Sequence, residues 1–185
     1  MKKTDKGAIH KLFAMIILVW AVFGWGVLLE VMRAGYVSQY LEDSLTQANL
    51  AAILVDPYHY GSTGEVIFEN VEATRELFLD TLHKGLGEEA VRQKLGLAEE
   101  VRLVDFRIYE VTSLGITEFM YDEDGQGRQT LFDSGAAVEA PDGTDIQNSS
   151  IYAKITVPVE FMLGVKVTAV KEHCVDIVSE ERVYE

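Results

Sequence analysis

The residues best spaced for chemistry are oxygen-bearing side chains between positions 122 and 133. They match positions one, three, five and twelve of an EF-hand calcium loop: Asp122, Asp124, Gln126 and Asp133. A glycine occupies position six, but glutamine and aspartate replace the usual residues at positions five and twelve, and flanking helices are not predicted. Two interpretations follow, a polar hairpin loop and a weak extracellular calcium site, and the departures favour the hairpin loop.

Cys174 is the only cysteine and directly follows His173, so this pair is the next candidate for nucleophilic chemistry. Adjacent strand residues point to opposite faces, which prevents a direct hydrogen bond between the two side chains. We therefore predict a half-buried thiol and no internal disulfide. His59 is predicted to be a packing or surface residue. The chain lacks HExxH, GxSxG and CxxC motifs and a phosphate-binding glycine loop, so we predict no enzymatic activity and no cofactor.

The elements that must position these residues begin with an apolar run from Leu12 to Leu29, eighteen residues without a charged side chain. A helix rises about 1.5 Å per residue, so such a run nearly spans a hydrocarbon core. Four lysines precede it and most acidic residues follow it, which predicts a cytoplasmic N-terminus and an extracytoplasmic C-terminal part. The run exceeds the ~7–15 apolar residues of a signal peptide and lacks a small-residue cleavage site. We therefore favour a permanent single-pass anchor over a cleaved signal.

The net charge also differs between the N-terminal segment that contains the apolar run and the rest of the chain. The whole chain carries −14 at pH 7; residues 1–33 carry five basic and two acidic side chains, so residues 34–185 carry −17. Such an acidic domain repels phosphate backbones and anionic headgroups, because nucleic-acid affinity depends largely on Lys and Arg contacts to phosphate. The sequence therefore predicts no nucleic-acid partner.

Six residues of the membrane region are candidates for subunit contact or for marking the membrane interface: Trp20, Gly24, Trp25, Gly26, Glu30 and Arg33. Tryptophan is typical of interfacial belts, and glycines permit close helix packing or local melting. The acid and the base are three residues apart, a spacing that allows an ion pair at modest cost near the headgroups. We favour interface marking for this pair, with subunit contact as the alternative.

Helical spacing of apolar residues continues beyond the membrane run. We predict one helix from about Ala8 to Leu54, ending at Asp56-Pro57 because a residue before proline disfavours the helical conformation. Pro158 lacks an N–H donor, so the strand that contains it is predicted to be an edge or bulged there. The other predicted elements are a short strand at 65–68, a helix capped by Asn70 and ended by Gly85 or Gly87, one or two turns at 88–95, and strands from 101, at 151–161 and at 165–177.

These elements predict an α+β fold. A long N-terminal helix, first transmembrane and then amphipathic, packs on a small antiparallel β-sheet in a pilin-like arrangement, with one or two further short helices. The chain accordingly has four predicted parts: a basic cytoplasmic leader at 1–11, a transmembrane helix at 12–29, an amphipathic continuation at 30–55 and an acidic α+β ectodomain at 56–185.

A basic leader, a glycine, an apolar helix with an amphipathic continuation and an antiparallel sheet together resemble the type IV pilin superfamily. Within it, the chain is most similar to the TadE-like minor pilins of tight-adherence (Flp/Tad) pili. The segments that carry the resemblance are KKTDKG at 2–7, the run 8–29, Glu30-x-x-Arg33, Tyr40-Leu41-Glu42-Asp43, Ala48-x-x-Ala51-Ala52 and ITVPVEFMLGVKVTAV at 155–170.

The resemblance implies a subunit that joins a filament or its initiating tip complex, with other pilin subunits and the assembly machinery as partners of the apolar helix. It also implies cleavage by a prepilin peptidase between Gly7 and Ala8. Pilins usually carry glutamate at the fifth position after the cleaved bond, where this chain has Leu12. A plain signal anchor is therefore the alternative, and the rival function is a single-pass extracytoplasmic binding or sensing subunit.

Overall fold

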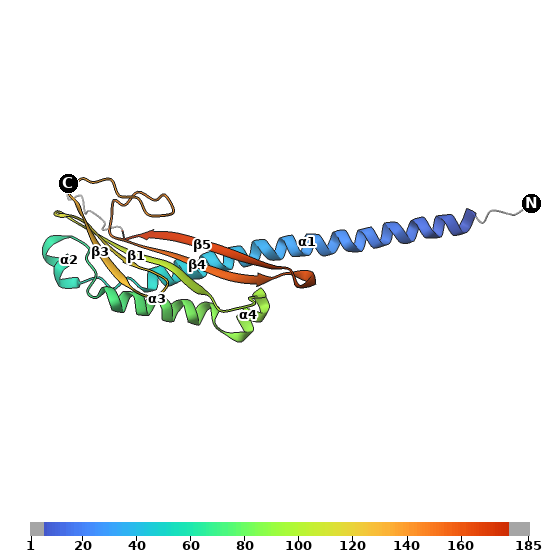
Figure 1. Ribbon diagram of the computed structural model, residues 1–185, viewed down its shortest axis with the longest axis horizontal. Coiled ribbons are helices and arrows are strands. Elements are labelled where there is room, and N and C mark those ends of the chain that lie inside the picture. The colour runs from blue at the N-terminus through green and yellow to red at the C-terminus, as the bar shows by residue number, and fades with distance from the viewer. Residues whose placement is uncertain (1–5, 178–185) are drawn as a thin grey trace, which may run out of the picture. The chain divides into compact units, whose positions relative to one another are not determined.

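The long N-terminal helix is present in the structure, a computed structural model that describes residues 6–177. Helix α1 (Lys6–Ala51) contains 46 residues and runs through the division between two compact units, residues 1–38 and residues 39–185 (Figure 1). We refer to the described part of the second unit, residues 39–177, as the head. The head combines helices with one antiparallel sheet, so the predicted α+β class is confirmed.

Helix α1 ends at Ala51, three residues before the predicted end. The chain leaves the helix because its next backbone groups bond elsewhere: the N–H of Glu69 donates to the carbonyl of Leu54 at 2.9 Å, and the N–H of Asp56 donates to a carbonyl at 3.0 Å. The strand predicted at 65–68 is wrong. Only an isolated bridge forms there, between Val55 and Phe68, because the two segments are antiparallel for too short a distance to build a ladder.

Asp56 begins a short helix that the sequence analysis did not predict, α2 (Pro57–Thr63). The Asp56 carboxylate accepts the N–H groups of Tyr58 and His59, and proline at the first helical position has no N–H to leave unsatisfied. The same Asp-Pro pair that ends one helix in the prediction therefore starts another in the structure.

The next two helices follow the prediction closely. Helix α3 (Val71–Leu86) starts at Asn70, whose side chain accepts the N–H of Ala73 at 3.0 Å, and Gly87 ends it. Helix α4 (Glu89–Leu95) supplies the expected extra turns and ends at Gly96 in the left-handed conformation. With α2 included, the head has three helices after α1 where the sequence predicted one or two.

The sheet has five strands, all paired antiparallel in the order β3-β2-β1-β4-β5. The strands are β1 (Arg102–Thr112), β2 (Gly115–Tyr121), β3 (Gly127–Asp133), β4 (Ser150–Glu160) and β5 (Lys166–Asp176). Strand β4 is therefore interior, between β1 and β5, and alternate residues along it are buried: Ile151, Ala153, Ile155, Val157 and Val159. Strands β3 and β5 are the edges.

Pro158 lies in strand β4 but does not interrupt the pairing of β4 with β1. Pairing of β4 with β1 stops at Thr156, so the neighbouring strand has not yet begun where Pro158 lies. The Pro158 carbonyl instead accepts the N–H of Ala98 at 2.8 Å, from the segment after α4. The predicted local edge is thus present, although the strand as a whole is interior.

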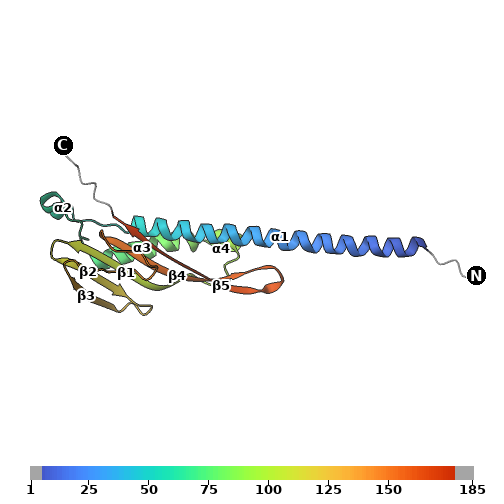
Figure 2. The same ribbon diagram turned by 90° about the horizontal axis from the view of Figure 1, so that it is seen from above.

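The part of α1 that belongs to the head, residues 39–51, and helix α3 lie along the sheet (Figure 2). The ring of Phe78 in α3 packs on Phe106 of β1, with centroids 4.9 Å apart. The other face of the sheet carries a smaller core, in which the loop 134–149 covers two tyrosines, Tyr109 and Tyr152. Its buried members are Tyr109, Ile116, Ala140, Ile146 and Tyr152.

Candidate functional site

The apolar part of helix α1 is exposed along its whole length. Sixteen large apolar side chains between Leu12 and Met32 have exposed fractions of 47% to 69%. Among the residues that the structure describes, α1 is the one helix long and apolar enough to cross a membrane. Its most apolar stretch is not buried against any other part of the protein. Burying one such side chain is worth roughly 1.5–3 kcal/mol, so this surface requires lipid or protein around it.

The predicted membrane-region residues lie on this exposed helix. Trp20 and Trp25 are 69% and 63% exposed, and the Trp20 ring meets Phe23 edge-on with centroids 6.2 Å apart. Helix α1 continues unbroken through Gly24 and Gly26. At Gly24 an added Cβ would meet no atom within 4 Å, which leaves a flat position on the helix surface.

The predicted ion pair at the end of the apolar run is also present. Arg33 Nη1 lies 3.5 Å from Glu30 Oε1, at the expected i,i+3 spacing. Both side chains are partly exposed, at 33% and 20%. The predicted processing positions Gly7 and Ala8 lie in the first turn of α1, and residues 1–5 of the predicted leader lie outside the described residues.

The C-terminal part of α1 is held by the head. Leu41, Leu45 and Ala48 are fully buried, at the three- and four-residue spacing of one helix face. Asn49 Nδ2 donates to the carbonyl of His173 in β5 at 3.1 Å, although Asn49 itself is 0% exposed. These contacts make the last turns of α1 part of the head's core.

The predicted calcium ligands do not come together. Asp122 lies in the turn between β2 and β3, where its Oδ1 accepts the N–H of Gln126 at 2.8 Å. Asp133 lies at the opposite end of β3, paired with Gly115, and the strand between them is about 20 Å long at 3.4 Å per residue. Among residues 6–177 no group of three or more His, Cys, Asp or Glu side chains could hold a metal ion. The calcium interpretation is therefore wrong for this set of residues: residues 122–126 form the polar turn of the β2–β3 hairpin, and residues 127–133 form strand β3.

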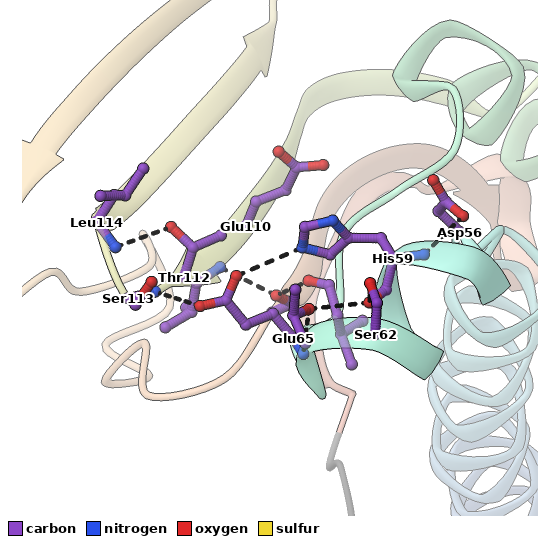
Figure 3. Close-up of polar contacts among 12 residues, drawn as sticks. Asp56, His59, Ser62, Glu65, Glu110, Thr112, Ser113 and Leu114 are labelled. Atoms are coloured by element: carbon purple, nitrogen blue, oxygen red, sulfur yellow. Dashed lines mark hydrogen bonds and ion pairs between the residues drawn. The ribbon is translucent and has the colours of Figure 1, made fainter.

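A polar cluster that the sequence did not predict joins the segment after α2 to the turn between β1 and β2 (Figure 3). Glu65 is at its centre: its Oε1 accepts the N–H of Ser113 at 2.7 Å, and its Oε2 lies 3.4 Å from His59 Nε2. The backbone N–H of Ser113, and to a smaller extent His59, favour the ionised carboxylate and lower the pKa of Glu65. His59 is half-buried, so it is the packing residue that the sequence suggested, with an added role as a partner of Glu65.

Glu110 contacts the same segment in a different way. Its Oε1 accepts the N–H of Phe68 at 2.9 Å, which fastens the chain before α3 to strand β1. Burial outweighs this hydrogen bond and raises the pKa of Glu110. The hydrogen bonds of Glu65 and Glu110 fix the loop around α2 to the sheet, and we assign the cluster a structural role.

A charged network occupies the sheet face that the loop 134–149 partly covers. Arg107 of β1 bonds Asp105 at 2.8 Å and Glu118 of β2 at 2.9 Å. On the neighbouring strands, Glu172 receives a hydrogen bond from the hydroxyl of Tyr152 at 2.8 Å and pairs with Lys154 at 2.9 Å. The alternation pattern predicts which positions are polar, but strand pairing decides which charges meet, so sequence reasoning did not identify these pairs.

Cys174 belongs to the edge of the smaller core. It is half-buried against the loop 134–149, as predicted, and burial raises the pKa of its thiol to about 12. A thiol with this pKa is protonated at neutral pH and is a poor nucleophile. His173 precedes it in strand β5, where successive side chains point to opposite faces, so the two do not form a catalytic pair.

No known protein family, curated protein or solved structure matches this chain.

Proposed function

We propose that the chain is a membrane-anchored, pilin-like subunit, similar to the TadE-like proteins, that takes part in the assembly of a tight-adherence or type IV pilus. The observation that carries the proposal is the divided use of α1. One stretch of this helix exposes sixteen large apolar side chains, and its last turns are buried in an α+β head. A helix of this kind can cross the membrane as a monomer and pack against similar helices in a filament.

The charge distribution supports the orientation. Basic residues precede the apolar stretch, and residues 34–185 after it carry a net charge of −17. The positive-inside rule therefore favours a cytoplasmic N-terminus and an extracytoplasmic head. The short segment before the apolar stretch is then the part available to a prepilin peptidase, with Gly7 and Ala8 at the processed bond.

A second candidate function is a single-pass extracytoplasmic binding or sensing subunit on a plain anchor. Leu12 favours it, because a pilin usually has at this position a glutamate that pairs with the N-terminal amine of a neighbouring subunit. Both functions require the same membrane anchor, and they differ in whether the N-terminus is processed and whether the helix contacts other subunits.

Processing is tested by co-expressing the chain with the prepilin peptidase of a tight-adherence system and measuring the intact mass. We expect a mature chain that starts at Ala8 and a Gly7→Val variant that retains Met1. A wild-type chain that also retains Met1 contradicts processing and favours the plain anchor.

Subunit contact is tested by cysteine cross-linking in membranes, in a Cys174→Ser background. We expect Val22→Cys, on the exposed stretch of α1, to cross-link to pilin subunits of the same system. The matched control is Leu114→Cys, which is 85% exposed at the turn between β1 and β2. If Val22→Cys captures no pilin subunit, or no more than the control does, the assembly role is wrong.

A further inference from the structure

The hairpin that joins β4 to β5 ends in exposed apolar side chains. Met162, Val165 and Val167 are 53%, 55% and 49% exposed, and Phe161 is half-buried beside them. The turn itself is a short helical segment, Met162–Gly164, closed by the N–H of Phe161 donating to the carbonyl of Val165 at 2.8 Å. We call residues 161–167 the hairpin tip.

The hairpin tip differs in charge from the rest of the head. Residues 161–171 contain Lys166 and Lys171 and no acidic residue, within a region 34–185 that carries −17. Lys171 pairs with Glu42 at 3.1 Å, while Lys166 is exposed opposite Glu160 in the ladder. Segments with exposed valine and methionine side chains beside a lysine can insert into the headgroup region of a bilayer. The apolar side chains then lie at the acyl boundary, and the lysine amine lies among the phosphates.

The hairpin tip lies at the end of the head where the chain arrives from the membrane run. Glu42 of α1 contacts Lys171 of β5, and Asn49 contacts His173, so helix and strand run in the same direction. Moving from Lys171 back to Lys166 therefore leads toward the N-terminal end of the head's part of α1. At about 3.3 Å per residue this displacement is about 16 Å.

The length of chain between the head and the apolar run is similar. Leu29, the last residue of that run, precedes Glu42 by thirteen residues of continuous helix. At about 1.5 Å per residue these residues extend about 20 Å. The length of chain between the Glu42–Lys171 contact and the apolar run is therefore comparable with the distance from the same contact to the hairpin tip.

We propose that the hairpin tip inserts into the headgroup region of the bilayer that α1 crosses. The head then has two attachments to the membrane, one covalent through α1 and one through the tip, and cannot rotate freely about its anchor. This inference rests on the membrane anchoring of the proposed function and is independent of processing and of subunit contact.

The test places an environment-sensitive fluorophore at Met162→Cys in the full-length chain, in a Cys174→Ser background. The protein is reconstituted at no more than one copy per nanodisc, in discs containing anionic lipid with headgroup-region quenchers. Leu114→Cys, at the opposite end of the head, is the aqueous control, and Val22→Cys reports on the apolar run itself. We expect quenching at Met162 at least twofold stronger than at Leu114, and we expect Val165→Asp with Val167→Asp to remove the difference.

The two aspartate substitutions lie at exposed positions, and an unchanged thermal midpoint shows that the head still folds. Equal quenching at Met162 and Leu114 overturns the tip proposal. Shielding of Met162 that appears only when discs hold several copies also overturns it and indicates contact with a second copy. Absence of quenching at Val22 by deep lipid quenchers contradicts membrane anchoring itself, so failure of the tip proposal and failure of the anchor are distinguished.

Discussion

Helix α1 contains two regions that lie in different surroundings. Between Leu12 and Met32 every large apolar side chain is exposed, whereas Leu41 and Leu45, about two and a half and three and a half turns further along the same helix, are fully buried in the head. The backbone is one continuous helix in both regions. Within the described chain, only the second region packs against other elements of the protein.

The comparison also shows why composition alone does not determine burial. The exposed region is apolar around its whole circumference, which is typical of a helix surrounded by lipid, whereas the buried region has one apolar face and a polar face that carries Glu42, Asp43 and Gln47. The sheet of the head covers the one apolar face of the buried region, but an open sheet of this size could not cover the whole circumference of the exposed region. The predictions below test this division.

The largest expected effect is the removal of residues 1–33. Deletion of the apolar stretch leaves the head's part of α1 in place. In a chain that also carries Val165→Asp and Val167→Asp, which remove the contact of the hairpin tip, we expect the protein to move from the membrane fraction to the soluble fraction with its thermal midpoint preserved. Deleting residues 2–5 alone is the control and leaves the protein in the membrane. A truncated chain with both aspartates that still sediments with membranes contradicts the division of α1.

A core truncation distinguishes the two regions energetically. Leu45→Ala removes a fully buried side chain, and we expect it to lower the head's free energy of unfolding by about 2–5 kcal/mol. Val22→Ala, at an exposed position of the same helix, leaves that free energy unchanged. Thermal unfolding in mild detergent, followed by circular dichroism of the sheet, measures both; equal effects would show that the two regions are not distinct.

A smaller effect is expected at the polar contact within the buried region. Asn49→Ala removes the hydrogen bond to the His173 carbonyl and should cost about 1 kcal/mol, the usual net contribution of one hydrogen bond. Gln47→Ala, an exposed position two residues earlier, is the matched control and should change stability by less than about 0.5 kcal/mol. A cost at Asn49 no larger than at Gln47 would show that this contact does not hold α1 to β5.

The smallest effects concern pH and two glutamates of the head. The lowered pKa of Glu65 gives a stabilising contribution that is present above the unfolded value of about 4.3 and is lost as the pH falls through the folded pKa. We expect Glu65→Gln to lower the thermal midpoint at pH 7 and to lose this part of the acid dependence. If the thermal midpoints of the wild type and the variant fell in parallel below about pH 5, Glu65 would not contribute to the acid dependence of stability.

Glu110 has the opposite sign. Its raised pKa means that the protonated form is favoured in the folded state, so its contribution is present below about pH 4.3 and is lost as the pH rises through the folded pKa. Glu110→Gln retains an oxygen for the N–H of Phe68, so we expect an equal or higher midpoint than wild type at pH 7 and no gain at pH 4. A lower midpoint at pH 7 would show that the charge itself is required.

Local signals in the sequence determined most of the elements. An apolar run of eighteen residues, an Asn70 cap, a glycine after α3 and the strict alternation of β4 each act over a few residues, so they could be interpreted without a fold. The same local reading failed at 65–68, where a short apolar segment resembles a strand but has too short a partner to form one.

Tertiary structure decided everything that depends on pairing between distant segments. The EF-hand spacing of Asp122 and Asp133 is correct in sequence, but a β-hairpin places the two at opposite ends of a strand, whereas a calcium loop would curl them together. Likewise, Tyr109 and Tyr152 are buried because the loop 134–149 covers them, a contact between residues far apart in the chain. Hydropathy and charge, which act residue by residue, predict the membrane anchor and its orientation. Register and long-range packing, which depend on all strands together, determined the polar clusters and the apolar hairpin tip.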